Sequence, residues 1–216
     1  MLRSQSIAAP SSVTPSSTVF VVDDDNGLRD AIQGLLRSVG HEVRTFRSAE
    51  EFLKSCDPSE PGCLVLDVRL PETSGLELQK RLVALDYRIP IVFISGHGDV
   101  PMTVQAMKGG AIDFLLKPFR EQDLLETIQA ALRRDRIQRD EVLKAHKDLA
   151  NARSLTARER EIMQHVVTGQ INKQIAAAVG LSEVTVKIHR AQVMRKMGAS
   201  SLADLVRIAD KLKAIS

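Results

Sequence analysis

The chain has 216 residues, more than one typical domain needs, so we expect two domains that each bury a core. Hydrophobic residues make up 44% of the sequence and charged residues 26%. No apolar run approaches the roughly 20 residues that cross a bilayer, which excludes a membrane-spanning protein and favours a cytoplasmic one. The two cysteines, Cys56 and Cys63, lack the spacing of a metal site or a disulfide framework, as expected in a reducing compartment.

Charge is divided unevenly along the chain. Residues 1–120 hold 13 Lys and Arg against 15 Asp and Glu, whereas residues 121–216 hold 17 against 12. This division predicts acidic chemistry in the first part and binding of a polyanion by the second. Residues 1–17 lack the apolar stretch of a secretory signal, and we expect them to form a disordered tail.

From residue 18 to residue 120 short apolar runs alternate with amphipathic segments. Helix starts are indicated by Ser48 with Glu51 and by Ser74 with Glu77, and one helix stop by Gly109-Gly110. The alternation predicts an α/β domain with a flavodoxin-like, five-stranded parallel sheet. The predicted strands are 19–22, 42–46, 63–67, 91–95 and 112–117.

Helical periodicity continues beyond Pro118, and neither Gly nor Pro occurs from residue 119 to residue 168. We therefore predict one long, charged helix over 121–153, which serves both as the last helix of the first domain and as a linker. The alternative is two shorter helices with a break near residues 135–139.

Four further helical segments are expected in residues 154–216. They are separated by Gly169, Gly180 and Gly198, and Thr156 with Glu159 forms another capping box. The helix 172–179, the short turn that follows it and the helix 183–197 together predict a helix-turn-helix, whose second helix can enter a major groove. The segment carries ten Lys and Arg against five Asp and Glu, the charge expected for contact with DNA phosphates.

Chemistry-bearing side chains follow the predicted strands. In a parallel sheet, ligands bind beyond the carboxyl ends of the strands, so residues that end different strands converge. Crowded carboxylates with only oxygen ligands favour Mg²⁺, and the whole set suits phosphoryl transfer to a carboxylate. The residues concerned are Asp23, Asp24, Asp67, Ser95 and Lys117.

The stretches VVDDD, LVLDVRLP and ISGHGDVPMTVQAMKGGAIDFLLKPF resemble the receiver domains of response regulators, in particular their FixJ-type branch, over residues 18–120. The resemblance implies that Asp67 accepts a phosphoryl group. It also implies that Asp24, Asp67 and the carbonyl of Arg69 bind Mg²⁺, which Mn²⁺ can replace, and that Asp23 assists through water. Ser95 and Phe114 would form a switch pair, and Lys117-Pro118 a cis peptide.

The second half, with LTARERE and NKQIAAAVGLSEVTVKIHRAQVMRKM, resembles the NarL/FixJ-type effector domain over residues 154–213. Three apolar positions of the second helix could pack into the core: Val184, either Ile188 or Val193, and Met197. The polar side chains of this helix would then face DNA. The likeness implies that Lys187 and Ile188 touch base edges, and that Thr185, Arg190 and Lys173 mainly contact phosphates. Leu202, Leu205 and Val206 would either pair two copies or close the four-helix core.

Together these likenesses predict a two-component response regulator and not an enzyme. A sensor histidine kinase would phosphorylate Asp67, and the phosphorylated chain would form a homodimer, bind double-stranded DNA and regulate transcription, with RNA polymerase as a further partner. Three alternatives are an aspartyl-phosphate phosphatase or phosphotransferase, a small-molecule-gated regulator, and a receiver whose effector has lost DNA binding. The phosphatase needs a substrate-binding cap, which the sequence does not contain.

Overall fold

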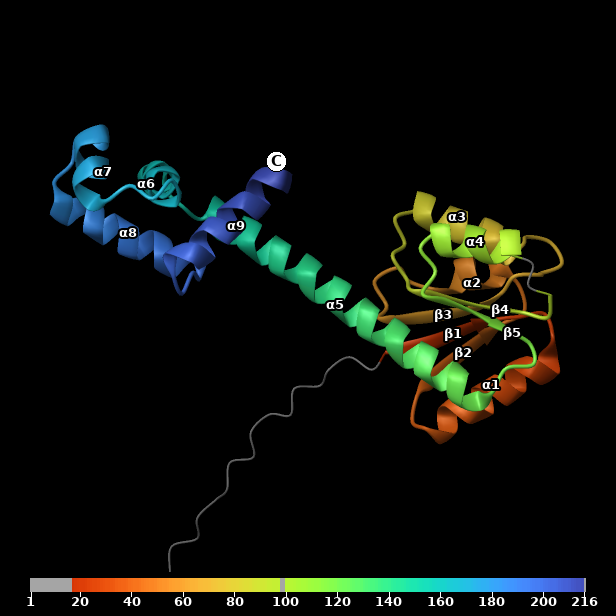
Figure 1. Cartoon of the computed structure of the whole chain (residues 1–216). Coiled ribbons are helices and arrows are strands. Elements are labelled where there is room, and N and C mark those ends of the chain that lie inside the picture. The colour runs from red at the N-terminus through yellow and green to blue at the C-terminus, as the bar shows by residue number, and fades with distance from the viewer. Residues whose placement is uncertain (1–16, 98–99, 216) are drawn as a thin grey trace, which may run out of the picture. The chain divides into compact units, whose positions relative to one another are not determined.

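The computed structural model describes residues 17–97 and 100–215, with side chains up to residue 213 (Figure 1). The chain divides between Gln138 and Arg139 into two compact units. The expected N-terminal tail falls almost wholly outside the described residues. None of the helices in the described residues has the length and apolar character needed to span a bilayer.

The first unit contains a five-stranded parallel sheet with the strand order β2-β1-β3-β4-β5. This confirms the predicted fold. The strands are β1 (Thr18–Val22), β2 (Glu42–Phe46), β3 (Gly62–Asp67), β4 (Ile91–Ser95) and β5 (Asp113–Leu116). The helices between and after them are α1 (Asn26–Ser38), α2 (Ala49–Ser55), α3 (Gly75–Ala84), α4 (Val100–Lys108) and α5 (Glu121–Arg153).

Helices cover both faces of the sheet, which explains why the three inner strands β1, β3 and β4 are buried along their whole length (Figure 1). Side chains alternate along a strand, so Val19 and Val21 of β1 pack in the cluster with α1 and α5. Phe20 and Val22 pack on the opposite face with α2, α3 and α4. The two apolar layers hold the carboxyl ends of the central strands at one edge of the sheet.

Helix α5 runs without a break over 33 residues, so the alternative of two shorter helices is wrong. Leu124, Ile128 and Ala131 bury its first turns against the sheet. One helical turn later the carboxylate of Asp135, which is 2% exposed, accepts a hydrogen bond of 3.0 Å from the backbone N–H of Gly62 at the start of β3. These contacts join α5 to the first unit through residue 135.

In the second unit, the helices that follow α5 in the described residues are α6 (Ala157–Val167), α7 (Asn172–Val179), α8 (Glu183–Met197) and α9 (Leu202–Ile215). Their core confirms the predicted all-α unit. Gly180 and Gly198 end α7 and α8 in the left-handed conformation, with φ of 68° and 64°, which glycine adopts without strain. Ser182 caps α8 by accepting the backbone N–H of Thr185.

Candidate functional site

Three strands end in charged side chains that meet at one edge of the sheet. Asp23 follows β1, Asp67 ends β3 and Lys117 follows β5. The ammonium Nζ of Lys117 lies 2.7 Å from Asp23 Oδ2 and 2.8 Å from Asp67 Oδ2. Asp23 is fully buried and Asp67 is 6% exposed. The fold therefore places two buried carboxylates around one cation, although the three residues are up to 94 positions apart in sequence.

The low exposure of this site alters the pKa values of two of its groups. Burial raises the pKa of the Asp23 carboxyl, because the charged form loses hydration, and this outweighs the hydrogen bonds from Lys117 and from the backbone N–H of Asp25. For Lys117 the balance is opposite: burial acts to lower its pKa, but hydrogen bonds to Asp23 and Asp67 outweigh it and raise the pKa above its ordinary value. Lys117 therefore remains protonated.

A third carboxylate, that of the exposed Asp24, completes an acidic cluster. One carboxylate oxygen from each of Asp23, Asp24 and Asp67 lies within 4.8 Å of the others. An all-oxygen donor set with one ligand open to solvent fits Mg²⁺, which retains several waters when bound. The backbone N–H of Arg69 donates to Asp67 Oδ1 at 3.1 Å, so the Arg69 peptide also lies beside this cluster.

The other predicted receiver residues lie on the neighbouring strands. Ser95 ends β4 fully buried, and its hydroxyl donates to the carbonyl of His97 at 2.8 Å. Phe114 in β5 is half-buried, with its ring centroid 6.2 Å from that of Phe93. The expected cis peptide at Lys117-Pro118 is confirmed.

Two residues at the site have structural roles that sequence reasoning did not assign. Asp25 caps α1, because its side chain accepts the backbone N–H of Leu28 at 3.1 Å. A Cβ on Gly75 would lie 2.2 Å from the carbonyl oxygen of Asp67, so only glycine lets the loop after β3 return so closely. A capping signal could have identified Asp25, whereas no local pattern indicates the close approach at Gly75.

In the second unit, α8 presents a mixed polar and apolar face. Val186, Val193 and Met197 are buried, whereas Val184 and Ile188 are 70% and 54% exposed. The expectation that Val184 packs inward is therefore wrong, and of the two alternatives Ile188 and Val193 it is Val193 that packs in the core, as does Met197. Val186, Val193 and Met197 are spaced by seven and then four residues, so they lie on one face of the helix. Val184 and Ile188 do not fit this spacing. The exposed face contains Val184, Lys187, Ile188, Ala191 and Arg195.

One polar contact links the amino end of α7 to the middle of α8, and another lies within the first turn of α8. Arg190 donates to the side-chain carbonyl of Asn172 at 3.2 Å, and Thr185 and Ser182 share a hydroxyl contact of 2.8 Å. Lys173 and Lys187 are exposed. Arg190 is therefore partly engaged within the unit, and Asn172 is a neighbour that sequence reasoning did not consider.

Comparison with known proteins agrees with this geometry. Residues 19–129 match the response regulator receiver domain, and residues 153–209 match the luxR family of bacterial regulatory proteins. The chain belongs to the response regulators. It is 54% identical over 198 residues to Nodulation protein W of Bradyrhizobium diazoefficiens, which covers 90% of this chain and 86% of that protein.

This response regulator also resembles relatives named as transcriptional regulators and not as enzymes. It is 41% identical over 197 residues to the transcriptional regulatory protein FixJ of Bradyrhizobium diazoefficiens, covering 91% of this chain and 96% of FixJ. The solved structure of the response regulator StyR matches with a TM-score of 0.80 at 49% identity, covering 91% of this chain and 99% of StyR. The predicted receiver domain and the predicted helix-turn-helix domain are thus confirmed. The roles of single residues stay predictions.

Proposed function

We propose that this response regulator accepts a phosphoryl group on Asp67 from a sensor histidine kinase in a Mg²⁺-dependent reaction. The main support for this proposal is the contact of 2.8 Å between Lys117 Nζ and Asp67 Oδ2, next to the acidic cluster with Asp23 and Asp24. Of the three carboxylates, only that of Asp67 ends the central strand and faces the other two. An attacking carboxylate, a cation and a metal-binding pair are the groups that phosphoryl transfer to an aspartate needs.

In the proposed reaction, a carboxylate oxygen of Asp67 forms a bond to phosphorus while the phosphorus–nitrogen bond of the donor phosphohistidine breaks. The released imidazole takes up a proton. Lys117 holds a phosphoryl oxygen as a point charge, and burial of the site strengthens that attraction. Asp24, Asp67 and the Arg69 carbonyl would hold Mg²⁺, with Asp23 assisting through water, and the ion would supply positive charge against the phosphoryl group.

A labelling experiment tests this assignment. We expect acetyl phosphate with Mg²⁺ to add one phosphoryl group to the protein, as measured by intact-mass spectrometry, and chelation of the metal by EDTA to abolish the adduct. Asp67→Asn should retain the fold and lose the adduct. As a matched control, Asp57→Asn changes an exposed aspartate outside the cluster and should label normally. An undiminished adduct on Asp67→Asn would refute the assignment.

The second unit would read double-stranded DNA through α8. The proposed base contacts are Lys187 and Ile188, and both side chains are exposed on one face. An exposed isoleucine suits a thymine methyl group, and lysine suits the acceptors of guanine. Thr185, Arg190 and Lys173 are proposed to contact phosphates. The charge of the unit supports this, since phosphate neutralisation dominates affinity for DNA.

Phosphorylation would be coupled to DNA binding by dimerisation in the cytoplasm. Movement of Ser95 toward the phosphoryl group would let Phe114 turn inward and reshape the surface of α4, β5 and α5, which includes the exposed Val104 and Leu116. Two joined effectors then bind two half-sites together, in contact with RNA polymerase. The proposed domains are the receiver at 18–120, the last receiver helix and linker at 121–153, and the effector at 154–216.

A further inference from the structure

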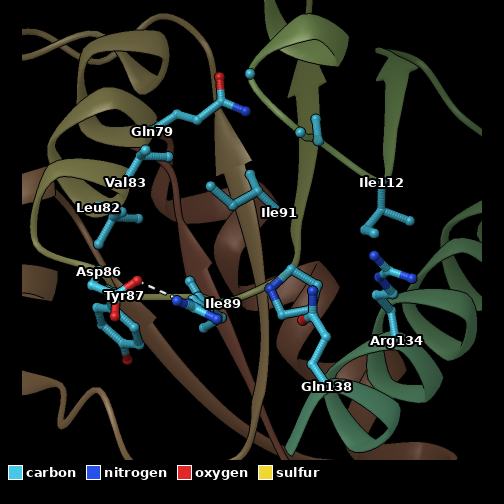
Figure 2. A pocket seen from close by; sticks show the side chains of 15 residues that line it. Gln79, Leu82, Val83, Asp86, Tyr87, Ile89, Ile91, Ile112, Arg134 and Gln138 are labelled. Carbon is cyan, nitrogen blue, oxygen red and sulfur yellow. Dashed lines mark hydrogen bonds and ion pairs between the residues drawn. The ribbon is translucent and has the colours of Figure 1, made fainter. Parts of the chain in front are cut away.

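The first unit contains a pocket of about 700 Å³ that the proposed phosphorylation does not use (Figure 2). It is lined by residues at the start of β4 and before β5, such as Ile91 and Ile112. These are the amino ends of the strands, whereas Asp67 and Ser95 lie at carboxyl ends. Its volume falls within the range of about 300–1,000 Å³ that is usual for sites of small organic molecules.

The walls of the pocket combine polar and apolar side chains, and the buried apolar ones lie together on one side. Leu82 from α3 and Ile89 and Ile91 from the following segment are at most 6% exposed and form a buried apolar floor. Val83 lies at the pocket as well and is 67% exposed, which leaves an apolar side chain open to solvent. Such a surface favours a ligand with an apolar body.

Two polar side chains enter the pocket from α5, opposite Leu82 and Val83 of α3, as Figure 2 shows. Arg134 and Gln138 are four residues apart, so they lie on one face of the helix. The side-chain carbonyl oxygen of Gln138 is buried, and no donor among the described residues reaches it. A buried acceptor without a donor is costly, so rotation of the Gln138 amide toward a ligand hydroxyl or N–H in the pocket would be favourable.

Arg134 supplies the charge that selects among such ligands. Within the described part of the chain it forms no hydrogen bond or ion pair, whereas the other arginine at the pocket, Arg88, is paired with Asp86 at 2.8 Å. A guanidinium that lacks a protein partner is available for a carboxylate or sulfonate, to which it can donate two parallel hydrogen bonds.

We propose that this pocket binds a small amphipathic organic acid, with its apolar body on Leu82, Ile89 and Ile91. Its anionic group pairs with Arg134, and its hydroxyl or N–H donates to Gln138. The bound molecule joins α3 to α5, the helix that continues from the receiver toward the effector unit. This response regulator therefore has a ligand site separate from the site of phosphorylation.

Two fluorescent probes test the proposal on the full chain. 1-Anilinonaphthalene-8-sulfonate has an apolar body, an anionic group and one N–H, and N-phenyl-1-naphthylamine is the same body without the anion. Arg134→Gln should weaken binding of the sulfonate about three- to fivefold, the range for a partly exposed ion pair, and leave the neutral probe unaffected. Arg133→Gln, which changes the adjacent exposed arginine outside the pocket, should alter neither affinity.

Methyl NMR of isoleucine locates the bound probe. The sulfonate should shift the resonances of Ile89, Ile91 and Ile112 and leave those of Ile162 and Ile175 in the effector core unchanged. Val83→Phe should narrow the pocket and weaken both probes, whereas Leu85→Phe, at an equally exposed position that does not line the pocket, should not. Equal sulfonate affinity in the two arginine variants, or shifts confined to the effector core, would overturn the proposal.

Labelling of Asp67 keeps this test separate from the proposed function. Arg134→Gln should accept the phosphoryl group from acetyl phosphate as the unchanged chain does, which also shows that its receiver is folded. Failure of labelling in every variant would count against the phosphorylation of Asp67 and not against the pocket.

Discussion

At the scale of single residues, Lys117 and Lys187 are two cations in very different surroundings. Lys117 is in contact with two carboxylates in a site that is largely closed to water. Lys187 is exposed, and no described residue forms an ion pair or hydrogen bond with it. The first side chain is already oriented by its partners, whereas the second can still adjust to a ligand.

The exposure of Lys187 leads to a prediction on DNA recognition. Lys187→Ala should weaken binding to a specific operator by about 1 to 3 kcal/mol and relax the sequence preference, as loss of a base contact does. Arg190→Ala should weaken specific and random duplexes alike. Titrations of both duplexes at one stated salt concentration distinguish the two results, with Lys211→Ala on α9 as a control for loss of charge. Equal losses on both duplexes for Lys187→Ala would make it a phosphate contact.

At the scale of elements, the start of α6 is joined to α8 by a buried ion pair. Glu159 completes the capping box of α6 by accepting the backbone N–H of Thr156 at 2.8 Å, and the same carboxylate oxygen accepts from Lys196 of α8 at 2.6 Å. The side chain of Glu159 is 4% exposed. One carboxylate therefore both caps a helix and fixes its packing against the recognition helix.

This ion pair predicts a pH dependence of stability. The hydrogen bond from Lys196, together with that from Thr156, lowers the pKa of Glu159 to about 2. Because the folded pKa is lower than that of the unfolded chain, the stabilisation is complete above about pH 5 and is lost as the pH falls toward about 2. Glu159→Gln should thus lower the melting temperature at neutral pH, and the difference from the unchanged chain should shrink on acidification.

Glu161, which is only partly buried and pairs with Arg158 on the same helix, is the matched control for this experiment. Glu161→Gln should cause little change in melting temperature at any pH, since ion pairs open to solvent contribute little. A difference between Glu159→Gln and the unchanged chain that stays constant from pH 7 to about pH 3 would contradict the role given to the Glu159 carboxylate.

At the scale of the whole molecule, two units with separate cores must respond to one chemical event. A complete switch from 1:99 to 99:1 would require about 5.5 kcal/mol of differential stabilisation, a large demand on a single phosphoryl group. We therefore expect partial DNA binding before phosphorylation and a gain that comes from dimerisation.

Sedimentation velocity tests this expectation with and without beryllofluoride, a mimic of the phosphoryl group. We expect the mimic to shift the chain from monomer toward dimer and to raise operator affinity, because joined effectors bind two half-sites at high effective concentration. Asp67→Asn should not respond. A chain that stays monomeric with unchanged operator affinity would exclude dimerisation and favour release of a masked recognition helix.

The sequence by itself determined which segments are strands and helices, and which residues gather at the edge of the sheet. Asp23, Asp67 and Lys117 could be placed together because each ends or follows a strand of a parallel sheet, and the caps at Thr156 and Ser182 are local patterns. Only the tertiary structure decided which face of α8 is buried, since Val184, Val186 and Ile188 are all apolar and packing against other helices selects Val186 alone. The pocket beside Arg134 and Gln138 also arises from packing, because residues far apart in the sequence form it and no local pattern records their distance.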